Sequence, residues 1–114
     1  MYNIDRSAAI IKPKKPFIEW ANHVPDADRE YTDEVFEKDC TVILIANYST
    51  EKEAREQVND IWEDIFDYEL YSWCTEEMWW PKDRTKEMFW QWFSVEYHSE
   101  IIDPFEDEIQ KEDL

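Results

Sequence analysis

Glu96, His98 and Glu100 are the residues of this 114-residue chain whose types and spacing come closest to a catalytic or metal-binding site. Alternation along a predicted strand puts all three side chains on one face, about 7 Å apart in succession. Two carboxylates and an imidazole form a ligand set that suits zinc or non-haem iron. His98 oriented by a neighbouring glutamate would instead act as a general base. The alternative is a purely structural role, in which these residues form a polar sheet face that discourages aggregation. No nucleophile or oxyanion donor accompanies the pattern, so we assign no catalytic residue, metal or cofactor.

Four carboxylates, Glu56, Asp60, Glu63 and Asp67, follow the i, i+4, i+7, i+11 spacing of one helix side. The pattern predicts either a solvated helix face or a docking surface for a basic protein partner. The row spans roughly 16 Å, so it offers one charge per about 5 Å. Duplex DNA carries one charge per about 1.7 Å, and this mismatch argues against mimicry of DNA by the row alone.

Trp79, Trp80 and Trp90 fit the apolar stripes of the predicted helices less well than the other aromatic residues. Aromatic rings among carboxylates can bind sugars or cationic ligands. The three indoles are therefore candidates for a ligand pocket, with burial in the core as the alternative.

The composition excludes several classes of function. A formal net charge of −17 argues against direct binding to nucleic acid or anionic membranes, which require basic patches. The chain has no glycine, so phosphate-cradling loops and nucleophile elbows are absent. Left-handed backbone conformations must fall to Asn22, Asn47 or aspartates.

The sequence shows no signal peptide or membrane span, and its two cysteines, Cys40 and Cys74, lack a C-x-x-C spacing. We therefore expect a cytoplasmic protein with two reduced thiols.

Hydrophobic patterning predicts three strands and three main helices. The strands cover residues 7–12, 41–46 and 95–102, and the segment 41–46, apolar on both faces, is expected at the centre of the sheet. One helix is expected to have Pro16 in its first turn and to end at Pro25. Two others are expected from a capping box at Thr50 and Glu53 to about Trp73, and from Asp83 or Thr85 to about Phe93. A short helical turn around Val35 and Phe36 is expected within an acidic connector over residues 26–39.

This order, β-α-β-α-α-β, predicts a two-layer α+β fold with a sheet of about three strands and helices mainly on one face. Residues 1–102 form the predicted single domain, and residues 103–114 an acidic, mobile tail. The segment 61–98 holds six of the seven tryptophans and should dominate the core. The second sheet face needs cover from the connector and tail or from a second copy, so a homodimer is also expected.

Three segments, IIKPKKPFIEWAN, WEDIFDYELYSW and WWPKDRTKEMFWQWFSVEYHSEIID, resemble an uncharacterised family of small acidic bacterial proteins. The resemblance covers about residues 7–103 and implies a bacterial cytoplasmic protein. It carries over no catalytic residue.

These observations favour a non-enzymatic module that binds another protein through an acidic docking surface. The alternative is a small metal-dependent or acid–base enzyme that uses Glu96, His98 and Glu100.

Overall fold

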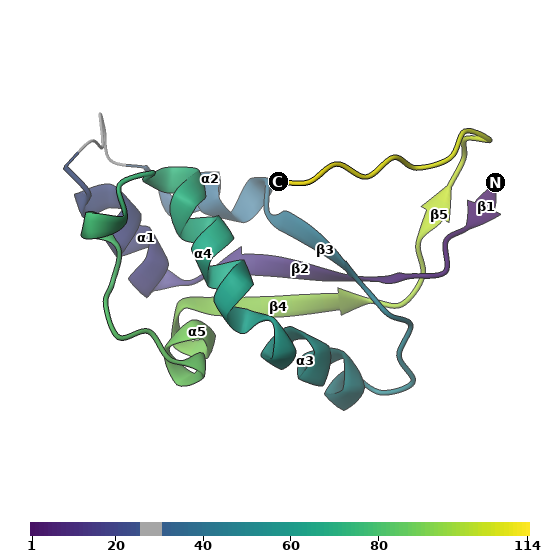
Figure 1. Ribbon diagram of the computed structural model, residues 1–114, viewed down its shortest axis with the longest axis horizontal. Helices are drawn as coiled ribbons and strands as arrows, with labels where there is room; N and C mark the ends of the chain where they lie inside the picture. Colours follow the sequence, from purple (N-terminus) through teal and green to yellow (C-terminus); the bar gives the residue numbers. More distant parts are fainter. Residues whose placement is uncertain (26–30) are drawn as a thin grey trace.

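An antiparallel three-stranded sheet with helices against one face forms the body of the protein in a computed structural model, which describes residues 1–25 and 31–114 (Figure 1). The elements in chain order are β1 (Tyr2–Asn3), β2 (Ser7–Pro13), α1 (Lys15–His23), α2 (Asp33–Lys38), β3 (Thr41–Ile45), α3 (Glu51–Asp60), α4 (Trp62–Trp73), the 3₁₀ turn η1 (Glu77–Trp79), α5 (Lys86–Trp92), β4 (Phe93–His98) and β5 (Ile102–Asp103). The predicted α+β class is confirmed. Residues 26–30 of the predicted connector lie outside the described residues.

The strand order is β3-β2-β4, so β2 is the central strand and β3 lies at an edge. The expectation that the segment 41–46 is central is therefore wrong. Ala9 pairs with Ile43 on one side and with Tyr97 on the other. The side chains of β2 are small or aliphatic, and both neighbouring strands can approach it closely.

The two sheet faces differ sharply in burial. Ala9 and Ile11 face the helices and are fully buried, because α3, α4 and α5 cover this side of the sheet (Figure 1). On the opposite face, Val42 and Leu44 are 55% and 47% exposed. Leu114, at the end of the acidic tail, lines a groove together with Val42, but about half of each of the Val42 and Leu44 side chains remains exposed.

Phenylalanine rings form the centre of the core. Phe93 lies 5.1 Å from Phe17, 5.3 Å from Phe66 and 5.1 Å from Phe89, centroid to centroid, and all four side chains are fully buried. Three of them come from the segment 61–98, in agreement with the prediction for that segment. Aromatic pairs at these separations contribute packing beyond the area that they bury.

Two threonines begin helices by the predicted mechanism. The Thr50 hydroxyl accepts a hydrogen bond from the Glu53 N–H at 3.2 Å, and the Thr85 hydroxyl accepts one from the Met88 N–H at 3.1 Å. The Glu53 carboxylate accepts from the Ser49 N–H at 2.9 Å, one residue before the position of a standard capping box.

The helix predicted from Glu51 to about Trp73 is two helices. The chain turns at Ile61, where φ is −126° and ψ is 19°, so α3 ends at Asp60 and α4 begins at Trp62. Ile61 is 37% exposed rather than part of the buried stripe.

The strand predicted over residues 95–102 is also divided. β4 covers Phe93–His98, and Ile102 pairs with Asn3 in a separate two-stranded sheet of β1 and β5. In Figure 1 this small sheet projects from the body, and residues 104–114 return from it toward the start of β3.

One described residue, Asp83, takes a left-handed conformation, with φ of 55°. The expectation that aspartate or asparagine would fill such a position is confirmed at this residue.

Candidate functional site

The structure joins two of the three residues predicted as a catalytic or metal-binding set. His98 Nε2 lies 3.2 Å from a Glu96 carboxylate oxygen, and Lys12 Nζ lies 3.7 Å from the same oxygen. The hydrogen bond from His98 and the charge of Lys12 hold the pKa of Glu96 below its usual value. Glu100 follows the end of β4. Within residues 1–25 and 31–114, no three His, Cys, Asp or Glu side chains form a group that could hold a metal.

The four carboxylates predicted as a docking row lie on two helices. Glu56 and Asp60 are on α3, Glu63 and Asp67 are on α4, and the turn at Ile61 separates the two pairs. Glu56, Asp60 and Glu63 are exposed. Asp67 forms an ion pair with Arg84, so its charge is partly neutralised within the molecule.

Trp79, Trp80 and Trp90 do not form one pocket. Trp80 is buried, and its indole N–H donates to the Cys74 carbonyl at 2.8 Å. Trp79 is 45% exposed on η1. The Trp90 indole N–H donates to Asn59 Oδ1 at 2.8 Å, and its ring lies beside Arg55 at the β4 side of the molecule.

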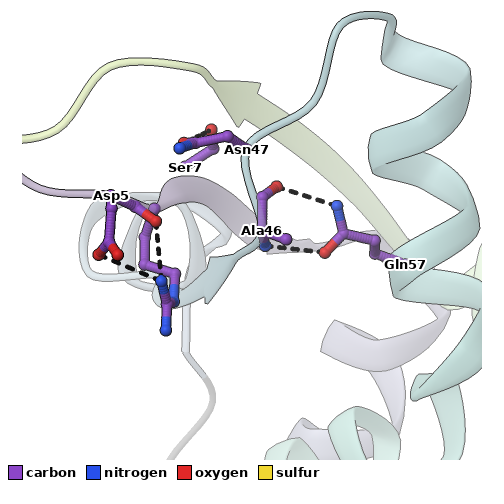
Figure 2. Close-up of polar contacts among 6 residues, drawn as sticks. Asp5, Ser7, Ala46, Asn47 and Gln57 are labelled. Atoms are coloured by element: carbon purple, nitrogen blue, oxygen red, sulfur yellow. Dashed lines mark hydrogen bonds and ion pairs between the residues drawn. The ribbon is translucent and has the colours of Figure 1, made fainter.

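The outer edge of β3 carries unpaired backbone groups. The Ala46 N–H donates to Gln57 Oε1 at 2.8 Å, and the Gln57 amide donates to the Ala46 carbonyl at 2.9 Å (Figure 2). Gln57 thus takes the place of a neighbouring strand at this one residue. Backbone groups alternate in direction along a strand, so those of Val42 and Leu44 point to the same side. No described strand lies beyond β3.

A buried serine fixes the end of this edge. The Ser7 hydroxyl, which is fully buried, lies 3.1 Å from Asn47 Oδ1 (Figure 2). The same hydroxyl lies 3.1 Å from the Ser99 carbonyl oxygen. These contacts tie the end of β3 to the start of β2 and to the chain that leaves β4. The edge is therefore held rigidly at its C-terminal end.

An apolar groove lies between β3 and α4 and extends the open edge. Its volume is about 400 Å³, and we call it the β3 groove; it is lined by Thr41, Val42, Ile43, Ile61, Asp64, Ile65, Tyr68 and Leu114. Ile61 and Tyr68 both line this groove and are 37% and 42% exposed, so the groove presents apolar surface to solvent. Asp64 is the one carboxylate side chain among the described residues of this lining.

The sequence analysis did not identify this groove. The signal was present in Thr41–Ala46, whose apolar residues point to both sheet faces, but that pattern suggested a central strand. An edge strand with the same pattern must expose one apolar face.

Glu69 and Cys40 are further ionisable groups near the start of β3. Glu69 is 6% exposed, and burial raises the pKa of its carboxyl above the usual value while a hydrogen bond with Thr41 opposes the rise. Burial also raises the pKa of the Cys40 thiol. Cys40 and Cys74 are both free.

Comparison of the chain with protein-family models, curated proteins and solved structures gives no match. None of the helices in the described part of the chain has the length and apolar character needed to cross a membrane.

Proposed function

We propose that this protein is a non-enzymatic interaction module that binds a basic protein partner through the β3 groove and the carboxylates beside it. The observation that carries the proposal is the exposure of Val42, Leu44 and Tyr68 next to an open strand edge. A partner segment that adds to β3 would pair with its free backbone groups and cover its apolar side chains.

The charge around the groove supports a basic partner. Asp64 lines the groove, and the exposed Asp60 and Glu63 lie within two residues of Ile61. A basic segment would meet these carboxylates as well as the overall charge of −17. Complementary charge accelerates association and selects against acidic competitors.

A cytoplasmic location is part of the proposal. The free thiols of Cys40 and Cys74 support it, since reducing conditions preserve thiols.

The test combines partner isolation with matched charge reversal. The tagged protein is used to recover partners from a native lysate, and each candidate is purified and titrated calorimetrically against the wild type. The triple variant Asp60→Lys, Glu63→Lys, Asp64→Lys should weaken a genuine partner about tenfold or more. Asp67 is omitted because its replacement would break the ion pair with Arg84.

The control carries the same change in net charge elsewhere. Glu19, Glu76 and Glu87 are exposed and lie outside the β3 groove, so their replacement by lysine should leave the affinity nearly unchanged. Equal loss in both triple variants would show a non-specific charge effect and would refute the docking site. So would the absence of any partner that binds in purified form.

A small acid–base or metal-dependent enzyme is the alternative, and the contact between Glu96 and His98 favours it. Elemental analysis of purified protein separates the two versions. Stoichiometric metal that is lost in His98→Ala would support a metal enzyme. A metal-free protein would leave an acid–base role, for which a hydrolase substrate panel with His98→Ala as control is the measurement.

A further inference from the structure

A groove at the opposite edge of the sheet, beside β4, has a different chemical character. Its volume is about 540 Å³, and we call it the β4 groove; it is lined by Lys14, Glu51, Lys52, Arg55, Trp90, Phe93, Ser94, Val95 and Tyr97. An adjoining hollow along the same strand adds Lys12, Tyr48 and Glu96 to the lining. The opening thus runs along the length of β4, between this strand and the beginning of α3.

Three basic side chains in this groove have no carboxylate partner. Across residues 1–25 and 31–114, none of the three side chains of Lys14, Lys52 and Arg55 forms an ion pair. The chain has 29 acidic and 12 basic residues, so carboxylates that could pair with these cations are abundant. Glu51 is the one acidic side chain in the lining of the β4 groove. The groove is therefore a cationic region in a strongly anionic protein.

Trp90 holds two of these cations in place. The Arg55 guanidinium carbon lies 3.7 Å from the centroid of the Trp90 ring, and the ring is fixed by its bond to Asn59. Lys14 Nζ donates to the Trp90 carbonyl at 3.2 Å. A guanidinium that stacks on a ring keeps its in-plane N–H groups free, and these fit a carboxylate as a fork. Arg55 is thus positioned for an acidic group before any ligand arrives.

The backbone of β4 is open along the same groove. The Lys14 N–H donates to the Trp92 carbonyl at 2.8 Å, and Lys12 pairs with Ser94. Even-numbered residues of β4 therefore direct their backbone groups to β2, so Val95 and Tyr97 direct theirs outward. No described strand lies on that side. The Tyr97 hydroxyl oxygen is also buried without a hydrogen-bond partner in the described chain.

The chain carries a segment with complementary properties. Residues 104–114 have five acidic side chains and one lysine, and they form no helix or strand. Phe105 and Ile109 in this segment are 71% and 57% exposed. Within one molecule the segment returns toward the start of β3, where Leu114 lines the β3 groove (Figure 1). It therefore lies away from the β4 groove of its own molecule.

We propose that the β4 groove receives residues 104–114 of a second copy of this chain as an added strand. The backbone groups of Val95 and Tyr97 pair with the segment, Arg55, Lys52 and Lys14 bind its carboxylates, and the apolar floor receives Phe105 or Ile109. The overall charge of −17 opposes contact between two copies at most surfaces. In this contact the basic side chains of the groove attract the carboxylates of the tail, and this local attraction opposes the overall repulsion between the two copies. The proposal involves the other edge of the sheet and does not depend on binding of a partner at the β3 groove.

The test is a charge exchange on the full-length protein, with sedimentation velocity in about 0.15 M salt, where surface charges beyond roughly 8 Å are screened. The wild type should show reversible self-association. Lys52→Glu should raise the dissociation constant about tenfold or more, since it replaces attraction by repulsion. Lys52 is exposed and forms no ion pair within the described part of the chain, so this variant should remain folded by circular dichroism. The tail variant Glu106→Lys, Glu108→Lys should weaken association equally.

Mixing and control variants complete the design. A mixture of Lys52→Glu and the tail variant should associate again, because the acidic tail of the first can bind the unchanged basic groove of the second. Lys86→Glu makes the same charge change outside the groove and should leave association unchanged. Hydrogen exchange at the Val95 and Tyr97 amides should slow as the protein concentration rises.

Three outcomes would overturn the proposal. One is a wild type that stays monomeric at millimolar concentration. Another is self-association that survives both Lys52→Glu and the tail variant. The third is an acetylated peptide of residues 104–114 that fails to bind while oligoglutamate binds, because the groove would then take a foreign acidic segment.

Discussion

The Arg55 guanidinium lies over the Trp90 ring, with its carbon 3.7 Å from the ring centroid, and the indole N–H of the same ring donates to Asn59 at 2.8 Å. Asn59 and Arg55 are both on α3, whereas Trp90 is on α5. The tryptophan thus connects two helices and orients a cation by one of its faces.

Replacement of Trp90 by phenylalanine tests this connection. Trp90→Phe loses the hydrogen bond to Asn59, so we expect the free energy of unfolding to fall by about 1 kcal/mol. Urea denaturation with fixed m-value is the measurement. Trp79→Phe is the control, since Trp79 is 45% exposed and its indole N–H donates no hydrogen bond within the described residues. Equal effects of both changes would argue that the Asn59 bond adds nothing.

Phe93 is the most consequential position of the core, because its ring contacts those of Phe17, Phe66 and Phe89. Phe93→Ala should lower the free energy of unfolding by about 3–5 kcal/mol. Phe105→Ala removes the same ring from an exposed site and should change it by less than about 0.5 kcal/mol. Thermal and urea unfolding of both variants would measure the difference. A loss below about 1 kcal/mol for Phe93→Ala would contradict the core described here.

Glu69 should make stability depend on pH. Its pKa is raised by burial, so the folded state binds a proton more tightly than the unfolded state does. This residue therefore lowers stability as pH rises from the usual glutamate range through the raised pKa. Glu69→Gln should be more stable than the wild type at neutral pH, and the advantage should vanish below the usual glutamate pKa. Unfolding of both proteins across that pH range is the measurement; an advantage that is constant with pH would refute the explanation.

Thr50 should contribute to α3 through its side-chain cap. Thr50→Ala removes the acceptor for the Glu53 N–H and should lower the free energy of unfolding by about 1 kcal/mol. Thr75→Ala is a suitable control, because Thr75 is exposed in a segment without regular structure. Chemical denaturation distinguishes the two, and indistinguishable midpoints would mean that the cap is dispensable.

Salt should stabilise the protein. With a formal net charge of −17, repulsion between like charges is stronger in the compact state than in the unfolded chain. Added sodium chloride screens this repulsion, so the thermal midpoint should rise. Chloride is preferable to sulfate, which also strengthens apolar burial. A midpoint that stays flat or falls with moderate NaCl would contradict the expectation.

Local signals predicted much of the fold. Apolar runs located β2 and β3 within one residue, and Thr50 marked the start of α3, because these features depend on neighbours along the chain. Of the two predicted starts of α5, Asp83 and Thr85, the structure selects Thr85. The strand order did not follow from such signals. An apolar strand can be central or can expose one face at an edge, and the choice depends on contacts with distant residues.

The grooves were harder to predict for the same reason. The β4 groove joins three distant parts of the sequence, around Lys14, around Arg55 and from Trp90 to Tyr97, which meet because β4 pairs with β2 beside α3 and α5. Trp90 was identified from its position off the helix stripe, but its basic neighbours were not. The turn at Ile61 had no proline or glycine to announce it. It divides a row of carboxylates that the helical spacing predicted as continuous.

The left-handed Asp83 shows how a chain without glycine manages a tight bend. Glycine is the residue with the most freedom to lose when a chain becomes ordered, and its replacement by another residue at a compatible site is worth about 0.4–1 kcal/mol. The unfolded state of a polypeptide without glycine thus has access to fewer backbone conformations. Its smaller entropic penalty partly compensates for the crowding of negative charge that folding imposes.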